Sequence, residues 1–246
     1  MKYFMILACV TAAFAARAAA DSPELAALVA LNTAARGGAA AIESISDFEA
    51  DIRIVEPTFE VDGRYVATRD GRMRVDILAG GERVFTEAVG RERAWSWDPK
   101  GGVMTASTEG RAALRHGIEL PIKLFGLHEM KARGHRLETA GREAIGGVEY
   151  HVLRLRLDDG FETLYFLNPD SGLIERERHH RALHVDVDPK PVWIETELSD
   201  WRAVAGVLYP HRSVEREVGT GQVLATVTTR AIRLNTSPPA ERFEKP

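Results

Sequence analysis

The stretch GVEYHVLRLRLDDGFETLYFLNPDSGL (147–173) decides the fold of this 246-residue chain. Two apolar-rich runs, 149–157 and 161–167, are each followed by a turn sequence, DDG (158–160) and NPDSG (168–172). Runs bounded by Asp, Asn, Pro and Gly are typical of antiparallel hairpins. Further strands are predicted from residue 173 onward and at 192–204, 207–218 and 222–235. The second half of the chain therefore predicts a large antiparallel sheet with almost no helix.

The first half repeats this pattern after an N-terminal helix. Residues 24–35 have apolar side chains at helical spacing, preceded by Ser22 and Pro23 and followed by Gly37-Gly38, with another turn or two predicted at 39–44. Apolar and charged residues then alternate from Asp47 onward, as in a half-buried strand. Later strands are predicted at 59–68, with a turn or bulge at Asp62-Gly63, and around 72–77, 82–89 and 95–97.

Residues 109–125 interrupt the strands. Arg111–His116 is compatible with a helix, Pro121 starts a new segment, and the region up to Leu127 is dense in apolar side chains. We interpret this region as a helical insertion between two halves of one sheet. The chain is mainly β (α+β), and no linker or second domain is evident, so residues 21–246 are expected to form a single domain. The tail 236–246 is predicted to be extended, with Phe243 holding it to the domain.

Residues 1–20 have the composition of a secretory signal peptide. An apolar run at 3–14 is followed by Ala18-Ala19-Ala20, which predicts cleavage before Asp21, with cleavage after Ala18 as the alternative. Loss of this segment removes two positive charges and changes the formal net charge from −4 to about −6. We therefore expect an exported protein located in the periplasm.

Cys9 is the only cysteine, and it lies inside this leader. One interpretation is a lipoprotein signal, because ILAC (6–9) looks like a lipobox. The other, which we favour, is a small apolar residue of an ordinary leader, since the apolar run before Cys9 is short. The mature chain would then have no cysteine and would depend on its hydrophobic core for stability.

The sequence offers little that suggests catalysis, a cofactor or nucleic-acid binding. Arginines are interleaved with glutamates and form no basic block, which argues against nucleic acid. There is no Gly-x-Ser-x-Gly motif, and Ser96 has no neighbouring base. The glycines at 80–81 and 219–221 suit hairpin turns better than phosphate loops. We expect no cofactor, and a binding protein rather than an enzyme.

A histidine cluster leaves one alternative open. His180 and His184 would share a face of a strand, with Asp186 and Asp188 as further candidate metal ligands. The alternative, which we favour, is an exposed and charged strand end, because 175–181 is polar on both faces and no standard zinc spacing is present. We therefore predict no metal site.

Several short motifs, taken in order, give the chain a family resemblance. They are AARGG (34–38), RMRV (72–75), RAWSWD (93–98), GVEYHVL (147–153), LYFLNPDSGLI (164–174), GVLYP (206–210) and IRLN (232–235). Together they span nearly all of the mature chain. With this set the sequence resembles the LolA/LolB-like outer-membrane lipoprotein-sorting proteins of the periplasm.

The resemblance implies a strongly curved, incompletely closed antiparallel barrel, covered by the N-terminal helix and the mid-chain insertion. It also implies a cavity for acyl chains. The expected function is a periplasmic carrier or binding protein for a lipid or a lipidated protein. The alternative is a protein-interaction or envelope-sensing module of the same fold without lipid cargo. Its expected partners are acyl chains of lipids or lipoproteins, and an envelope protein, with peripheral membrane contact and a monomeric state.

The predicted lining residues are apolar side chains that alternate along strands, and they form ordinary core if the barrel is filled. They are Met73, Val75, Ile77, Trp95, Trp97, Leu153, Leu155 and Phe166. A second set, from the insertion, is expected either to pack as an ordinary helix or to act as a mobile lid. It consists of Ile118, Leu120, Leu124 and Phe125.

Overall fold

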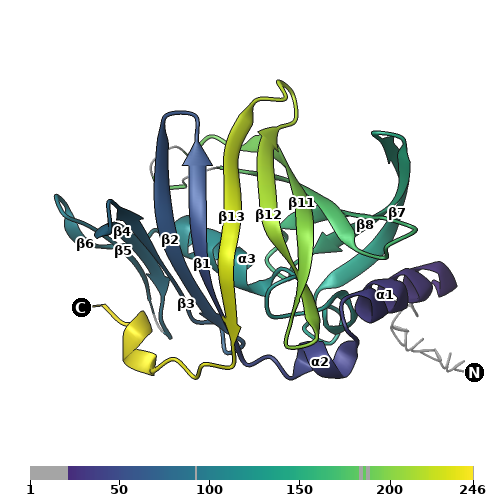
Figure 1. Ribbon diagram of the computed structural model, residues 1–246, viewed down its shortest axis with the longest axis horizontal. Helices are drawn as coiled ribbons and strands as arrows, with labels where there is room; N and C mark the ends of the chain where they lie inside the picture. Colours follow the sequence, from purple (N-terminus) through teal and green to yellow (C-terminus); the bar gives the residue numbers. More distant parts are fainter. Residues whose placement is uncertain (1–21, 92, 183–184, 187–188, 246) are drawn as a thin grey trace, which may run out of the picture.

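One antiparallel sheet of thirteen strands organises the chain (Figure 1). This computed structural model describes residues 22–91, 93–182, 185–186 and 189–245; the predicted leader with Cys9 lies outside them. The strand order is β6-β5-β4-β3-β2-β1-β13-β12-β11-β10-β9-β8-β7. Strands that are adjacent in the sheet are consecutive in the chain, except at the middle, where β1 pairs with β13 and joins the two halves of the chain. The predicted mainly-β fold is confirmed.

The elements follow the predicted order closely. They are α1 (Pro23–Ala35), α2 (Ala39–Glu43), β1 (Asp47–Glu56), β2 (Phe59–Thr68), β3 (Met73–Ala79), β4 (Glu82–Val89), β5 (Ala94–Asp98), β6 (Gly102–Thr105), α3 (Thr108–Glu119), η1 (Leu127–Glu129), β7 (Arg136–Ile145), β8 (Val148–Arg156), β9 (Glu162–Leu167), β10 (Ile174–Arg181), β11 (Val192–Val204), β12 (Val207–Glu217), β13 (Val223–Leu234) and η2 (Ala240–Phe243).

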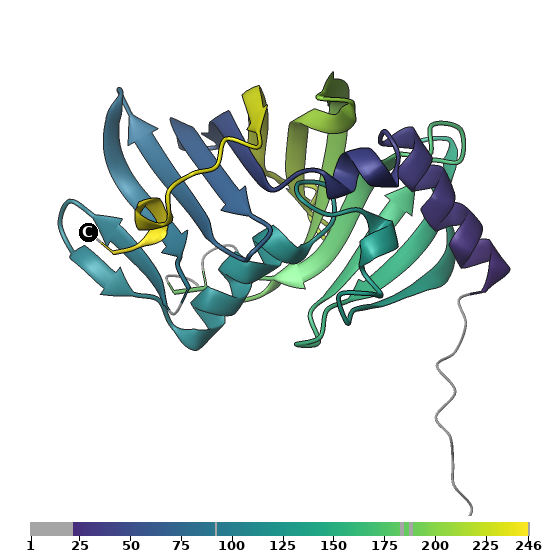
Figure 2. The same ribbon diagram turned by 90° about the horizontal axis from the view of Figure 1, so that it is seen from below.

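The sheet is curved and does not close, with β6 and β7 as its edges. Irregular register occurs in several strand pairs, including β1–β13, β3–β4, β7–β8, β9–β10 and β12–β13. Such bulges increase local twist and bend a sheet. Figure 2 shows the resulting arch, with α3 beneath it and α1 beside its β7–β9 end. The incompletely closed barrel expected from the resemblance is confirmed.

One predicted irregularity is wrong. The Asp62-Gly63 pair is not a turn or bulge, because β2 runs through it in continuous register with β1. Gly63 is opposite Ile52, and a Cβ there would lie 2.8 Å from the Ile52 Cγ1 atom. Glycine is therefore used here for close packing within a regular strand.

The N-terminal helix is tied to the sheet at its C-terminal end. The Ser22 side chain accepts a hydrogen bond from the Leu25 amide, so it caps α1 as predicted. At the other end Gly37 has a φ of 117°, and a Cβ there would lie 2.1 Å from the Gly206 carbonyl oxygen in the β11–β12 turn. Only glycine fits this conformation at this approach distance.

The C-terminal tail packs on the convex face of β3–β5. Phe243 is fully buried, as predicted, and its carbonyl oxygen accepts a hydrogen bond from the Trp95 Nε1 atom at 3.0 Å. The guanidinium of Arg72 lies over the Phe243 ring. No helix among the described residues has the length and apolar character needed to span a membrane.

Candidate functional site

The concave face of the sheet forms the main hydrophobic core. Met73, Leu153 and Leu155 are buried in it, and Val75 packs against it. Ile77 is half-buried and has the same strand parity as Met73 and Val75, so it shares their face. Five of the eight predicted lining residues therefore lie on the concave face.

The two tryptophans lie on the opposite face. Ala94, which is buried in the concave core, alternates with Trp95, and the Trp95 ring packs under the Arg74 guanidinium and the C-terminal tail. Trp97 has the same parity and lies 4.2 Å from the Arg83 guanidinium carbon. Trp95 borders a cavity beneath α3, but its indole is on the far side of the strand. Both indole rings therefore lie outside the concave core, and their role in lining a ligand cavity stays a prediction.

Phe166 is also on the convex face. It pairs with Val152 across β8–β9, whereas Leu153 pairs with Tyr165. Phe166 and Val152 belong to a small separate cluster that includes Tyr150. The Arg178 guanidinium covers the Phe166 ring at 4.7 Å. Phe166 therefore also lies outside the concave core, and its role as a lining residue stays a prediction.

The predicted lid residues are packed into the concave side. Ile118 at the end of α3, and Leu124 and Phe125 in the loop after it, are buried, whereas Leu120 is half-buried. Phe125 lies between two guanidinium groups, with Arg133 at 3.6 Å and Arg69 at 4.7 Å from its ring centre. Segment 120–126 thus occupies space inside the arch.

A buried arginine holds this segment in place. Arg36, at the end of α1, is 1% exposed. Its Nη1 atom donates to the Phe125 carbonyl oxygen at 3.1 Å and its Nη2 atom to the Ile122 carbonyl oxygen at 2.6 Å. Burial lowers the pKa of Arg36 to about 10. Ile122 has a φ of 109°, a strained conformation for a β-branched residue, so the loop is held against its own preference.

Two cavities remain on either side of this segment. One of about 320 Å³ lies beneath α3, and Phe161 and His179 contribute to its lining. The other, of about 300 Å³, lies beneath the middle of the sheet and is lined largely by apolar groups such as Phe48, Ile52 and Leu198. The residues common to both linings are Gly117, Leu120, Lys123, Glu177 and Glu215.

The boundary between the cavities carries ionisable side chains. Burial raises the pKa of Glu177 to about 7 and lowers the pKa of Lys123. Arg181 pairs with Glu215 at 3.3 Å. His179 is 5% exposed, and its burial, with a smaller contribution from Arg181, lowers its pKa to about 3, so its ring is neutral.

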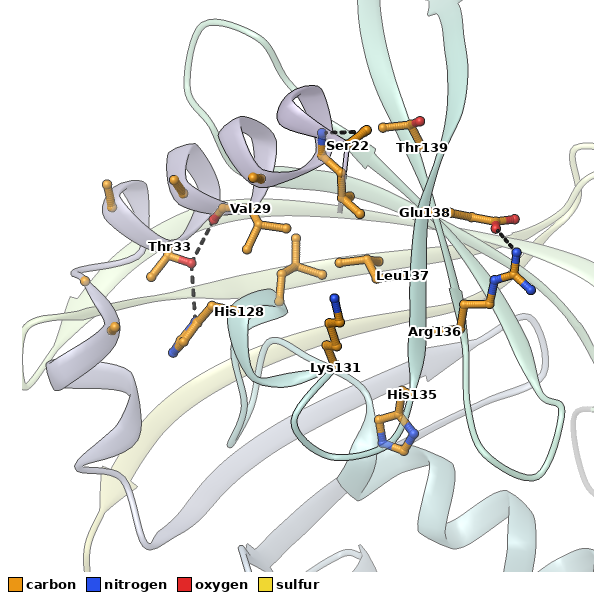
Figure 3. A pocket seen from close by; sticks show the side chains of 17 residues that line it. Ser22, Val29, Thr33, His128, Lys131, His135, Arg136, Leu137, Glu138 and Thr139 are labelled. Atoms are coloured by element: carbon orange, nitrogen blue, oxygen red, sulfur yellow. Dashed lines mark hydrogen bonds and ion pairs between the residues drawn. The ribbon is translucent and has the colours of Figure 1, made fainter. Parts of the chain in front are cut away.

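A third and larger space lies at the other end of the arch (Figure 3). This groove of about 1060 Å³ is bounded by α1, η1 and the edge strand β7. Val29 from α1 and Leu137 from β7 point into it, and Lys131 and His128 lie along one side. The ring of His128 is placed by Thr33 at 3.3 Å and Glu43 at 3.2 Å. The groove is therefore apolar between α1 and β7, with a lysine and a histidine side chain along one side.

Solved structures provide the comparison for this architecture. A LolA superfamily protein from Nitrosomonas europaea is 12% identical, with a TM-score of 0.59 over 90% of this chain and 97% of that chain. A putative outer membrane lipoprotein-sorting protein domain from Vibrio parahaemolyticus is 11% identical, with a TM-score of 0.58 over 89% and 96%. This chain has the LolA-like fold. A DUF1329 family protein from Desulfovibrio piger shares it, at 13% identity and a TM-score of 0.58 over 89% and 97%.

The likeness is one of structure alone. No protein family matches the sequence, and no curated protein matches it either. At these identities the comparison shows the LolA-like fold and does not identify a ligand.

The candidate metal cluster is only partly within the described residues. His184 and Asp188 lie outside them. His180 is exposed and stacks on Trp193 at 5.2 Å, and Asp186 accepts a hydrogen bond from the hydroxyl of Ser107, the N-cap residue of α3. Across the described part of the chain, no three His, Cys, Asp or Glu side chains are grouped closely enough to hold a metal ion.

The polar residues that line the two cavities beneath the sheet are not evident from the sequence. Residues 175–181 were interpreted as an exposed strand end because both faces are polar, yet Glu177 is only partly exposed and His179 is buried. Lys123 stands alone among apolar neighbours in the insertion, and a single charge in such a segment was the available signal. Arg36 lay within a motif already quoted, but its burial depends on the distant loop that it contacts.

Proposed function

We propose that this protein is a periplasmic carrier or binding protein for a lipid or a lipidated protein, and that it holds acyl chains on the concave face. The single observation that carries this proposal is segment 120–126, an apolar loop inserted between two cavities and fixed by one buried arginine. Such a loop occupies space that an acyl chain would also fill, so ligand and loop compete for one surface.

The energies suit reversible holding. Each methylene removed from water contributes about 0.8 kcal/mol, so a sixteen-carbon chain offers on the order of 13 kcal/mol. Association and the displacement of the loop cost several kcal/mol of that.

We propose that the groove beside α1 provides further apolar surface for a second chain or for the lipidated segment of a protein. We propose no catalytic role and a monomeric state.

The first test uses the protein purified under native conditions. Organic extraction followed by mass spectrometry would identify a co-purified lipid, and a fluorescent fatty-acid probe would measure uptake. Absence of both would contradict the carrier proposal and favour the alternative, a protein-interaction or envelope-sensing module whose interior is filled by its own loop.

A matched pair of variants localises the uptake. Ile52 lines the central cavity, whereas Val55, three residues later on the same strand, is 40% exposed. Ile52→Trp fills the cavity and is expected to reduce probe uptake, and Val55→Trp is expected to leave it unchanged. Equal effects of the two variants would show that the probe binds elsewhere.

A further inference from the structure

A row of polar side chains crosses the middle of the concave face. Tyr165 is paired with Glu177, Glu177 with Thr196, and Thr196 with Glu215, on the adjacent strands β9 to β12. Cross-strand partners share a face of the sheet, so all four side chains point into the arch. Glu177, Thr196 and Glu215 all line the central cavity. An interior that only dissolved acyl chains would not need such a row.

Several polar atoms around this row have no partner among the described residues. The Thr196 Oγ1 atom and the Tyr209 hydroxyl line the central cavity, and the residues are 4% and 1% exposed. The His179 ring, on the α3 side, also has one unpaired nitrogen. Its Nε2 atom accepts a hydrogen bond from the Arg181 Nε atom at 2.9 Å. Because arginine only donates, the neutral ring carries its proton on Nδ1, and that buried N–H has no acceptor. Buried polar groups of this kind are normally hydrogen-bonded.

The charges around the row are balanced but incompletely paired. Arg181 and Glu215 form an ion pair, as described above. Lys123 instead donates to the Gly117 carbonyl oxygen at 3.3 Å, and its Nζ atom lies 5.2 Å from the Tyr65 ring centre. Glu177 feels the charge of Lys123 and forms no direct hydrogen bond or ion pair within the described part of the chain. An acid and a base therefore face one space without direct contact.

This arrangement selects against charged ligands. An anionic head group would be repelled by Glu177 and Glu215, and a cationic one by Lys123 and Arg181. A neutral head group with hydroxyls can donate to the Glu177 carboxylate and accept from Lys123, from Thr196 and from the His179 N–H. It therefore satisfies the unpaired atoms without adding a charge to a buried site.

We propose that the junction of the two cavities binds the uncharged, hydroxyl-bearing head group of a single-chain amphiphile of the monoacylglycerol class. The head group lies among Lys123, Glu177, Thr196 and His179, and the acyl chain extends along the apolar lining of the central cavity. This inference rests on the proposed lipid-binding function and names the ligand class for the same surface.

The test compares three ligands with the same twelve-carbon chain: monododecanoylglycerol, dodecanoate and dodecylamine. Each ligand is added, below its own critical micelle concentration, to mature protein that holds the apolar fluorophore N-phenyl-1-naphthylamine. Displacement of the fluorophore measures the affinity of the ligand. Monododecanoylglycerol is expected to bind about tenfold more tightly than either charged ligand. This ratio corresponds to the free energy lost when one buried polar group is left unpaired. Equal affinities, or tighter binding of a charged ligand, would overturn the head-group inference while leaving lipid binding intact. A wild-type protein that binds no fluorophore would overturn the proposed function itself.

Two variants assign the preference to the polar row. Thr196→Val is expected to reduce the preference for the glycerol ester several-fold, and Glu177→Gln is expected to bring dodecanoate closer to it by removing a repulsive charge. Thr228→Val is the control. Val227 and Thr229 line the central cavity, whereas Thr228 between them is exposed on the opposite face of β13. Thermal unfolding confirms that each variant is folded. If the ratio of the affinities for the glycerol ester and the charged ligands is unchanged in both variants, the head group binds elsewhere and the inference is refuted.

Discussion

Replacement of Arg36 by methionine tests whether one side chain holds the loop closed. Met is similar in length, so the space next to Tyr209 stays largely filled, but both hydrogen bonds to segment 120–126 are lost. Among the described residues, the Ile122 carbonyl oxygen then has no donor, and the Phe125 carbonyl oxygen retains only the Ile122 amide, at 3.0 Å. Arg36→Lys should be intermediate, because a single ammonium does not reproduce the fork that reaches two carbonyls.

The magnitude follows from these contacts. Hydrogen bonds from a charged donor contribute about 1.5–3 kcal/mol each, and the burial that lowers the pKa of Arg36 offsets part of this. We expect Arg36→Met to lose about 2–4 kcal/mol of unfolding free energy. Release of the strained φ at Ile122 favours local opening of the loop over global unfolding.

Hydrogen exchange and urea unfolding together provide the assay. The Ile122 amide should lose protection in Arg36→Met, and uptake of an apolar probe should become faster, because the loop no longer blocks the cavities. Arg202→Met is the control: the Arg202 side chain is 60% exposed and pairs with Asp200 on the surface, so little change in stability is expected. Full protection of 120–126 in Arg36→Met, with a stability loss below about 1 kcal/mol, would refute the assigned role.

Three further predictions test the remaining assignments. Trp95→Phe removes the hydrogen bond to the C-terminal tail, so it should lower the melting temperature yet leave probe uptake unchanged, as an uptake assay beside thermal unfolding would show. Gly37→Ala should cost at least about 3 kcal/mol in urea unfolding, whereas Gly38→Ala, where a Cβ would meet nothing within 4 Å, should cost about 1 kcal/mol; equal costs would contradict the close approach. Glu177 has a folded-state pKa raised from 4.5 to about 7, so the folded protein binds more protons in that window and this residue lowers stability as pH rises through it. Unfolding free energies measured from pH 4.5 to 7 should therefore rise more steeply with pH in Glu177→Gln than in the wild type, by roughly 1–3 kcal/mol in total, and parallel curves would exclude the effect.

The strands could be predicted because their signals are local. Turn residues and alternation fix where a strand starts and ends, and β11 was predicted with its observed bounds, 192–204. The side of the sheet that each residue faces depends on what packs there. Ala94 faces the core on the side where α3 packs against β5, and Trp95 lies on the convex face, covered by a tail more than a hundred residues away.

Two strands gave no usable alternation at all. β9 is apolar at four consecutive positions from Leu164 to Leu167, so nothing in the sequence separates Phe166 from Tyr165. Only the pairing with β8 puts Tyr165 inside and Phe166 outside. β10 is polar on both faces, and its burial becomes evident only when β9 and β11 surround it.

The polar row differs from an ordinary buried salt bridge in what it leaves unsatisfied. A buried ion pair that serves the fold normally has its lone pairs and protons taken up by neighbours, because removing charges from water is costly. Arg181 and Glu215 meet that requirement, and the convex-face pairs of Arg178 with Glu143 and Glu195 meet it as well. Glu177 and Lys123 do not: among the described residues, the acid has no direct partner and the base has only a carbonyl oxygen and an aromatic ring. Thr196 adds a third unpaired group on the same cavity wall. Unpaired donors and acceptors that share one accessible cavity are better explained by a ligand that completes them than by stability of the fold, and this argument favours a polar head group inside the arch over an interior reserved for hydrocarbon.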